Sequence, residues 1–195
     1  MKWVVGIDEV GRGPVAGPVY VCAVAMTETV YKKAVWPGLT DSKKMTAKAR
    51  EQWHTEVRAI EKRGALLIAI SSRSAKMIDK KGISACIREC IAECLEKLGI
   101  EARDARVLLD GSLKAPTQYK NQETIIKGDL KEKIISLASV VAKVERDHYM
   151  IALAKKHPAY LWQQNKGYGT KMHIAAIKKW GLTPFHRKSF LTRLS

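Results

Sequence analysis

The stretch WVVGIDEVGRGP, residues 3–14, places two adjacent acids directly after a short apolar strand. Residues 3–7 have the length and the β-branched content of a buried strand. Asp8 and Glu9 follow, and the chain then turns through a Gly-Arg-Gly-Pro loop. A buried carboxylate without a partner is very costly, so acids at the tip of such a strand need a partner for their charge. A divalent cation with oxygen ligands, Mg²⁺ or Mn²⁺, is the expected partner.

The glycine spacing in this loop does not make a dinucleotide-binding fingerprint. That motif needs its last glycine three residues after the second and a helix behind it. Here Pro14 and Pro18 intervene, and residues 19–25, VYVCAVA, read as a second strand. Strand, glycine loop and strand predict a hairpin, whose backbone N–H groups can come close to a ligand because glycine lacks a side chain.

The excess of basic residues makes a polyanion the expected partner. Lys and Arg number 35 against 19 Asp and Glu, a formal charge of +16 over 195 residues. Neutralisation of phosphates dominates non-specific affinity for nucleic acid. The basic residues are spread as doublets, such as residues 80–81 and 178–179, which suits a folded surface that follows a phosphate backbone. A basic protein that has no nucleic-acid partner is the alternative.

The cysteines are predicted to be small core residues. Cys86, Cys90 and Cys94 recur every four residues on one face of a helix, and the sequence has no C-x-x-C pair. Nothing at the N-terminus resembles a signal peptide, and no segment is long enough to span a membrane. We therefore expect a cytoplasmic protein in a reducing compartment, with no membrane partner.

Strands that alternate with helices predict an α/β layer fold with a mixed sheet. Beyond the opening hairpin, strands are expected at 65–70, 107–109 and 124–126. Helices are expected at 83–98 and 130–155, with a break at 79–82. One domain is the default for this length, with an aromatic and basic part near its C-terminal end.

Two later acids also come at or just after predicted strands. Asp110 ends the strand at 107–109, and Asp129 comes shortly after 124–126. Sites in open α/β sheets lie beside strand ends, so these acids could converge with Asp8. Asp8 and Glu9 would point to opposite faces of a regular strand, so both serve one site only if the strand ends or twists at Glu9. Asp129 could instead act at a helix N-terminus.

The histidines offer no competing metal motif, because none has H-E-x-x-H spacing. They are interpreted as surface or capping residues: His54, His148, His157, His173 and His186. Acids combined with a basic surface favour metal-assisted phosphoryl transfer instead.

The opening motif and several later segments resemble the type 2 ribonuclease H family. DEVGRGP at 8–14, followed by AGPV at 16–19, matches the first motif of that family, and its Gly-Arg-Gly favours type 2 over the related type 3 enzymes. Further landmarks occur in order over nearly the whole chain: DSKK (41–44), LDG (109–111), KGD (127–129), ASVVAKV (138–144), RD (146–147), KGYGT (166–170) and HRKSF (186–190).

The resemblance implies a ribonuclease H-like fold, with a five-stranded mixed β-sheet flanked by helices. The catalytic core would span 1–157, and a small C-terminal helical segment, 158–195, would line the substrate groove. The resemblance also implies which acids are catalytic and bind metal: Asp8, Glu9, Asp110 and Asp129. Two ions, Mg²⁺ or Mn²⁺, bridging one phosphate would activate the attacking water and stabilise the leaving 3′-oxygen.

The expected reaction is hydrolysis of the RNA strand of RNA–DNA hybrids and cleavage at ribonucleotides embedded in duplex DNA, leaving 3′-hydroxyl and 5′-phosphate ends. The 2′-hydroxyl distinguishes RNA from DNA, and the resemblance assigns its recognition to the backbone of Gly11, Arg12 and Gly13. Tyr168 matches the family tyrosine that packs against the sugar at the RNA–DNA junction. Ser42, Lys43 and Lys44 are candidate phosphate contacts, and the lysine doublet could equally be a solvated turn.

Two other functions stay open from the sequence. One is a non-catalytic, basic nucleic-acid-binding protein that has kept the fold. Against it, four acids near a phosphate would repel that phosphate unless a metal ion intervened. The other is a ribonuclease H-like nuclease for another nucleic acid, such as a junction resolvase. A monomer is the default, and no tail that would dock on a sliding clamp is obvious.

Overall fold

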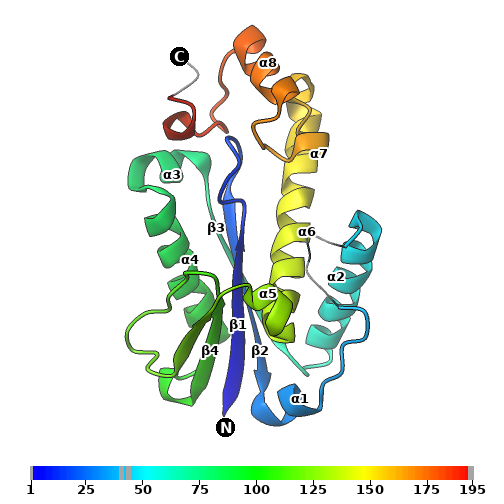
Figure 1. Ribbon diagram of the computed structural model, residues 1–195, viewed down its shortest axis with the longest axis vertical. Coiled ribbons are helices and arrows are strands. Elements are labelled where there is room, and N and C mark those ends of the chain that lie inside the picture. The colour runs from blue at the N-terminus through cyan, green and yellow to red at the C-terminus, as the bar shows by residue number, and fades with distance from the viewer. Residues whose placement is uncertain (1, 40–41, 43–44, 193–195) are drawn as a thin grey trace.

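The computed structural model describes residues 2–39, 42 and 45–192. Within these residues the chain forms one five-stranded sheet with helices on both faces (Figure 1). The strands lie in the order β3-β2-β1-β4-β5. The central pair β1–β4 and its neighbour β4–β5 are parallel, whereas β1–β2 and β2–β3 are antiparallel. The predicted mixed five-stranded sheet is confirmed; its strands are β1 (Trp3–Val10), β2 (Val19–Thr27), β3 (Leu67–Arg73), β4 (Ala105–Asp110) and β5 (Gln122–Ile125).

Each face of the sheet is covered by a long helix. Helix α4 (Ile83–Leu98), preceded by α3 (Ala75–Lys81), packs on one face, and α6 (Lys133–Lys156) packs on the other (Figure 1). Helix α2 (Ala47–Lys62) lies against α6. Two short helices, α1 (Glu28–Lys33) and α5 (Gly128–Lys131), connect these layers.

The opening segment forms the predicted antiparallel hairpin. Strand β1 pairs with β2 up to Val10, which lies opposite Tyr20, so β1 does not end at Glu9. Val5 and Ile7 belong to the core under α4, whereas Val4 belongs to the core under α6. Asp8 and Glu9 therefore continue this alternation onto opposite faces of the sheet.

Helix α6 packs so closely on β1 that there is no room for a side chain at Gly6. A Cβ atom at Gly6 would lie 2.5 Å from the backbone carbonyl carbon of Ile134. The helix is buried nearly all round its N-terminal half, as its apolar sequence predicts. This close contact fixes the distance between the helix and the end of β1, where Asp8 lies.

Three details of the sequence interpretation need correction. The predicted break at 79–82 is wrong for residues 79–81, which belong to α3, and only Gly82 ends that helix. The single helix expected at 130–155 is two helices, because Glu132 separates α5 from α6. The short helix α1 was not predicted. The cysteine interpretation is confirmed, since all four are free and buried.

The C-terminal segment forms a small core of its own with the end of α6. It contains α7 (Trp162–Asn165), α8 (Lys171–Trp180) and the 3-10 turns Pro158–Tyr160 and Lys188–Phe190. Its buried cluster also includes Ala16 of the loop after β1. Because this cluster joins residues from both sides of position 157, the division into 1–157 and 158–195 stays a prediction. No helix in the described part of the chain is long and apolar enough to cross a membrane.

Two histidines of this segment correct the sequence interpretation. His173 and His186 are buried, not surface residues, and their Nε2 atoms lie 3.2 Å apart. The Trp162 indole donates a hydrogen bond to His173 Nε2 at 2.9 Å, and His186 Nδ1 accepts one from the Thr183 backbone at 2.9 Å. Burial lowers the pKa of both imidazoles, that of His186 to about 4. Neutral imidazoles whose nitrogens are paired are stable inside a core.

Candidate active site

Three of the four acids predicted from the sequence, Asp8, Glu9 and Asp110, lie near the carboxyl ends of the parallel strands β1 and β4. Ile7 of β1 pairs with Leu109 of β4, so Asp8 and Asp110 follow side by side on neighbouring strands. Asp129 lies in the first turn of α5, directly after β5. The backbone N–H groups of Gly128 and Asp129 donate to Asp110 Oδ1 at 2.7 and 3.4 Å, which ties this turn to the end of β4.

Asp8 is a buried carboxyl group whose surroundings oppose its charge. Its side chain faces α6, and Oδ1 accepts a hydrogen bond from the Glu9 backbone at 2.8 Å. Burial raises the pKa of Asp8 to about 8, the nearby Glu9 and Asp110 add to the rise, and a hydrogen bond from Ser139 opposes it. A carboxylate in this position is stabilised by any cation that approaches it.

Glu9 lies on the opposite face of β1 and is still coupled to the same site. Burial raises its pKa, Arg12 opposes the rise, and Asp110 adds to it. Arg12 Nη1 lies 3.5 Å from Glu9 Oε1, with the guanidinium half exposed. From the sequence, Glu9 was expected to share a site with Asp8 only if the strand ended or twisted there. In the structure the strand continues to Val10, and Asp110 still raises the pKa of Glu9.

Asp129 is buried and is held through its backbone. The Ser136 hydroxyl of α6 donates a short hydrogen bond to the Asp129 carbonyl oxygen. Asp129 lies in the first turn of the short helix α5 and not of the long helix α6, so the helix N-terminal alternative does not involve the long helix. Lys127 before it has a left-handed backbone, with φ of 55°, which turns the chain sharply from β5 into α5.

The donor chemistry of these residues fits a hard divalent cation. Clustered carboxylates on a protein with a large positive charge lower their mutual repulsion most directly by sharing such an ion. Within the described residues, no group of three or more His, Cys, Asp or Glu side chains is already assembled so that it could hold a metal ion. The acids are therefore gathered at one edge of the sheet but not closed to coordination distance.

The other residues predicted for the substrate site differ in their exposure and in their contacts. Tyr168 is 46% exposed, and its Cε1 lies 3.9 Å from where a Cβ atom on Gly13 would be, so this ring borders the glycine loop. Ser42 is buried, and its hydroxyl lies 2.8 Å from that of Ser139. Lys43 and Lys44 lie outside the described residues. The roles assigned to Ser42, Lys43 and Lys44 stay predictions.

The sequence interpretation missed three buried polar residues around this site. Ser139 of α6 hydrogen-bonds Asp8 and Ser42. Arg146 and Arg187 are fully buried and donate to backbone carbonyls of the glycine loop and its continuation. Both arginines lie in segments that resemble the type 2 ribonuclease H family, and this resemblance was the one signal in the sequence that could have pointed to them. No local pattern marks a residue whose hydrogen-bond partners lie more than a hundred positions away.

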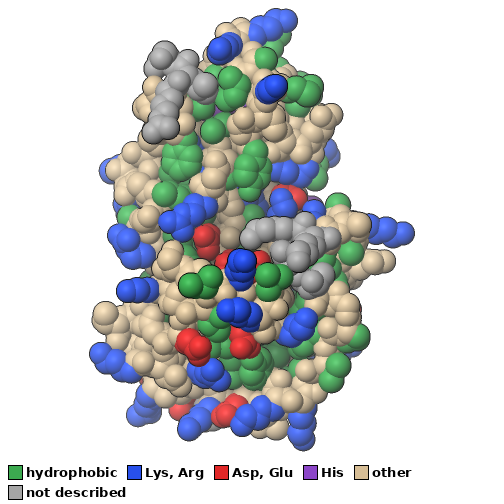
Figure 2. Space-filling model, viewed as in Figure 1, with side chains coloured by type: hydrophobic (Ala, Val, Ile, Leu, Met, Phe, Trp, Pro, Cys, Tyr) green, Lys and Arg blue, Asp and Glu red, His purple; other side chains and the backbone are tan. Residues whose placement is uncertain are grey.

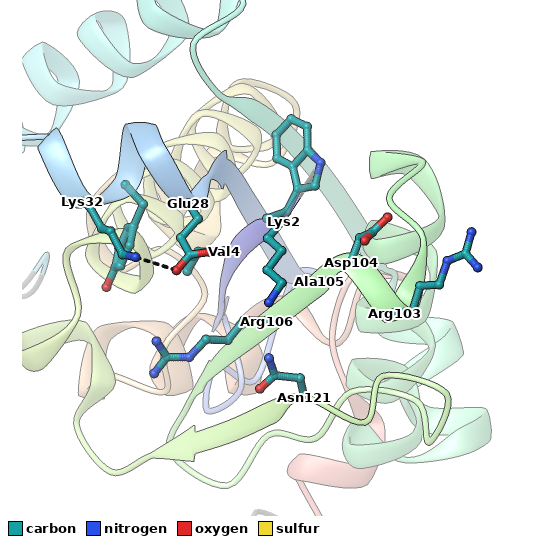
Figure 3. Close-up of a pocket in the computed structure, with 11 residues that line it drawn as sticks. Lys2, Val4, Glu28, Lys32, Arg103, Asp104, Ala105, Arg106 and Asn121 are labelled. Carbon is teal, nitrogen blue, oxygen red and sulfur yellow. Dashed lines mark ion pairs between the residues drawn. The ribbon is translucent and has the colours of Figure 1, made fainter.

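One face of the molecule carries both acidic and basic side chains. Figure 2 shows acidic side chains near the middle of one face, with Lys and Arg side chains spread around them. A separate cavity of about 230 Å³ lies at the other end of β1 and β4, near Lys2, Ala105 and Arg106 (Figure 3). There Glu28 pairs with Lys32 at 2.7 Å. Because this cavity adjoins the amino ends of the strands, it is remote from Asp8 and Asp110.

Comparison with known proteins shows the family of this chain. The family model described as Ribonuclease HII matches residues 5–193. The chain belongs to the ribonuclease HII family. Ribonuclease HII of Bacillus cereus (strain Q1) is 40% identical over 190 residues, which cover 97% of this chain and 69% of that protein. Ribonuclease HII of Clostridium beijerinckii is 42% identical over 193 residues, covering 99% and 69%.

Solved structures show the same fold. Ribonuclease HII of Archaeoglobus fulgidus, solved in a complex with PCNA, has a TM-score of 0.72 and 25% identity, covering 94% of this chain and 93% of that one. Bst RNase HIII, solved with Mn²⁺, has a TM-score of 0.69 and 14% identity, covering 98% and 65%. Membership of the ribonuclease HII family makes this chain an endonuclease of the ribonuclease H type, with activity toward RNA–DNA hybrids.

Proposed function

We propose that this ribonuclease HII family member cleaves ribonucleotides embedded in duplex DNA as well as the RNA strand of hybrids, in a metal-dependent reaction that leaves 3′-hydroxyl and 5′-phosphate ends. The observation that carries this proposal is the convergence of Asp8 and Asp110 at the carboxyl ends of adjacent parallel strands. A buried carboxyl at this edge, beside a strongly basic surface, suits a reaction on a phosphodiester.

Asp8, Glu9, Asp110 and Asp129 would hold Mg²⁺ or Mn²⁺, with two ions in the reacting complex. Bound there, the cations would supply charge to the attacking water and to the leaving 3′-oxygen. The Mn²⁺ reported for the structurally similar Bst RNase HIII supports this choice of ion. Asp110 is already oriented by the N–H groups of the β5–α5 turn, so one of its oxygens is fixed and the other is left to act as a ligand.

The substrate would lie across the glycine loop and the C-terminal segment. Backbone N–H groups of Gly11, Arg12 and Gly13 would meet the 2′-hydroxyl of the ribonucleotide. Tyr168, which borders Gly13 with a half-exposed ring, would pack on the sugar at the RNA–DNA junction. Ser42, Lys43 and Lys44 would contact phosphates and would contribute no sequence preference. We further propose that the protein acts as a cytoplasmic monomer.

A DNA duplex that contains one ribonucleotide tests the proposal. With Mg²⁺ or Mn²⁺ we expect one cut beside the ribonucleotide, mapped at nucleotide resolution, and no cut when EDTA replaces the metal. An all-DNA duplex of the same sequence is the control. Cleavage of the all-DNA duplex would favour a resolvase-like nuclease, and tight binding without any cleavage would favour a non-catalytic binding protein.

A further inference from the structure

Two fully buried arginines surround the loop that follows β1. Arg146 and Arg187 are both 0% exposed, and within the described residues neither forms an ion pair with a carboxylate. Their guanidinium groups donate instead to backbone carbonyl oxygens. Burial and the neighbouring Arg146 lower the pKa of Arg187 to about 9. Burial of a charged group without a carboxylate partner costs free energy, which indicates that each arginine has a specific structural role.

Arg187 holds the inner side of the glycine loop with all three of its nitrogens. Its Nη2 donates to the Gly11 carbonyl at 2.6 Å, its Nη1 to the Arg12 carbonyl at 3.0 Å and its Nε to the Gly17 carbonyl at 2.9 Å. The planar fork of a guanidinium can serve three separate acceptors at once, whereas the single nitrogen of lysine cannot. The loop is thus fixed by one side chain from the other end of the sequence.

These contacts determine where the opposite sides of the same peptide groups point. The Gly11 carbonyl belongs to the peptide that carries the Arg12 N–H, and the Arg12 carbonyl to the peptide that carries the Gly13 N–H. In a trans peptide the C=O and N–H bonds point in opposite directions, and none of the described peptides is cis. Both N–H groups therefore face away from Arg187, and within the described residues neither has an acceptor.

The second arginine secures the other half of the loop. Arg146 donates to the carbonyls of Pro18 at 2.9 Å, Ala16 at 3.3 Å and Lys166 at 3.0 Å. The loop in turn donates from Ala16 to the Gly167 carbonyl at 3.1 Å. The segment that carries Tyr168 is thereby fixed to the same frame as the glycine loop.

We propose that Arg187 is a positioning residue for sugar recognition: by holding the Gly11 and Arg12 carbonyls inward, it presents the N–H groups of Arg12 and Gly13 to the 2′-hydroxyl of a ribonucleotide. This rests on the proposed function above. The positive charge on the carbonyl side also polarises both peptides, which strengthens their N–H groups as donors. Arg187 does not touch the substrate itself, and its effect is on selectivity for the ribose.

The test is Arg187→Lys, which keeps the charge and removes the fork. We expect kcat/KM for a duplex with one ribonucleotide to fall about tenfold or more, as for the loss of a well-oriented hydrogen bond. The inhibition constant of an all-DNA competitor duplex should stay within about twofold, because phosphate contacts are unchanged. A kcat/KM like that of the wild type, or an equal weakening of both quantities, would overturn the proposal.

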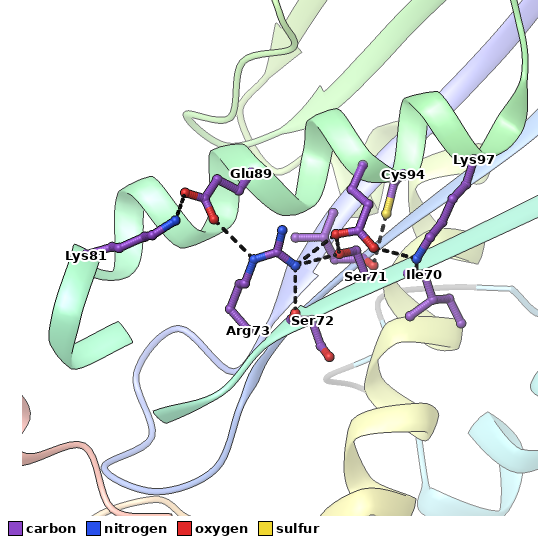
Figure 4. Close-up of polar contacts among 10 residues, drawn as sticks. Ile70, Ser71, Ser72, Arg73, Lys81, Glu89, Cys94 and Lys97 are labelled. Atoms are coloured by element: carbon purple, nitrogen blue, oxygen red, sulfur yellow. Dashed lines mark hydrogen bonds and ion pairs between the residues drawn. The ribbon is translucent and has the colours of Figure 1, made fainter. Parts of the chain in front are cut away.

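Arg73→Lys is the matched control. Arg73 also makes several hydrogen bonds from one guanidinium, but its partners are Glu89 and Glu93 of α4 and Ser71 and Ser72 of its own strand β3 (Figure 4). The same chemical change there should leave both quantities within about twofold of the wild type. A tenfold loss of ribonucleotide cleavage in Arg73→Lys would show that the effect of Arg187→Lys is unspecific, and would count against the proposal.

A second variant and a second measurement test the role of Arg187 even if Arg187→Lys does not fold. Phe190→Leu leaves Arg187 in place but removes the ring whose centroid lies 5.1 Å from its guanidinium carbon, so a smaller loss in the same direction is expected even if Arg187→Lys does not fold. Hydrogen exchange at 11–18 should be faster in either variant, with β1 unchanged. If the wild type does not cleave the ribonucleotide duplex, the proposed function fails, whereas unchanged exchange at 11–18 refutes the positioning role alone.

Discussion

Asp8 combines two properties that rarely occur together in one residue, since it is almost fully buried and it lies within the influence of two further acids. Its role in the site is predicted from the sequence, because a buried acid after a short apolar run needs a partner for its charge. The sequence indicated only that Asp110 could converge with Asp8 if their strands were neighbours, and the parallel pairing of β1 with β4 brings the two strand ends to one edge. Ser139 does not follow, because its position in a uniformly apolar helix gives no sign that it faces Asp8.

Removing a single negative charge from this site should abolish cleavage. We expect Asp8→Asn and Asp110→Asn each to lower the cleavage rate by about 10³-fold or more, equivalent to about 4 kcal/mol of barrier, because the amide is a poor ligand for a hard cation. Affinity for an RNA–DNA hybrid should be nearly unchanged, since it depends on the basic surface. Single-turnover cleavage and a filter-binding titration measure the two quantities. Substantial turnover by either variant would refute the assigned site.

Ser139 should affect cleavage without contacting the substrate. Its hydroxyl stabilises the charged form of Asp8 and is also hydrogen-bonded to Ser42. Ser139→Ala should lower kcat by about 10- to 100-fold, the range found when a group that orients a metal ligand is lost. Ser71→Ala, at an equally buried serine bonded to Glu93, is the control and should leave kcat unchanged. Equal kcat values for the two variants would mean that Ser139 has no such role.

Among the helices and strands, those with a strong apolar periodicity could be predicted from the sequence, and those with a weak periodicity could not. The hairpin, α4 and α6 follow from their apolar patterns, because each buries a long continuous face. Helix α3 buries only Ala75 and Ile78, which is too little for its sequence to be distinguished from a loop. The separation of α5 from α6 depends on the backbone turn at Glu132, which places Asp129, and no side-chain pattern encodes it.

The contact between α6 and β1 should be intolerant of even one methyl group. Gly6→Ala would put a Cβ atom 2.5 Å from the Ile134 carbonyl carbon, where only backbone movement can relieve the clash. We expect the free energy of unfolding to fall by about 2–3 kcal/mol, as for an overpacked core. Gly64→Ala, where φ is 75° and no atom lies nearby, should cost only about 1 kcal/mol of backbone strain. Urea denaturation measures both, and equal losses would contradict this account.

The buried imidazole of His186 should make the folded state sensitive to mild acid. Its pKa is about 4 in the folded chain against about 6.5 in an unfolded one, so between these values the unfolded state binds more protons. Stability is therefore complete above about pH 6.5 and decreases toward pH 4, by up to about 1.4 kcal/mol per pH unit. The rings of His173, Tyr160 and Trp162 pack against this imidazole, and the lowered pKa of His173 adds to the same trend.

The variant His186→Gln should flatten this dependence. Between about pH 7 and pH 5 we expect the free energy of unfolding of the wild type to decrease by about 2 kcal/mol more than that of the variant. His148→Gln, which removes an exposed histidine bonded to Glu51, should keep the wild-type dependence. Urea titrations at the two pH values provide the measurement. Identical slopes for the wild type and His186→Gln would show that this imidazole does not titrate on unfolding.

For the molecule as a whole, the feature least accessible to sequence reasoning is the return of the C-terminal segment to the first loop. Ala16 forms a β-bridge with His186, and Arg187 hydrogen-bonds residues about 170 positions earlier in the chain. Figure 1 shows the segment that follows α8 beside the tip of the β1–β2 hairpin. Local patterns describe neighbours along the chain, so a contact over this separation is visible only once the fold is known.

The net charge of the whole chain should control how tightly any duplex binds but not which sugar is preferred. With a charge of +16, neutralised phosphates release counterions, so affinity should fall steeply as salt rises. If about 6–10 phosphates are contacted, affinity for both all-DNA and ribonucleotide-containing duplexes should drop by about 10³- to 10⁵-fold between about 50 and 200 mM salt. Their ratio should change by less than about threefold, because an uncharged hydroxyl bound by backbone N–H groups releases no ions. Fluorescence anisotropy at several salt concentrations measures, for each duplex, the slope of affinity against salt concentration.

Unequal slopes for the two duplexes would mean that ribose recognition itself depends on lysine or arginine charge. Parallel shallow slopes would mean that the basic surface does not follow the duplex.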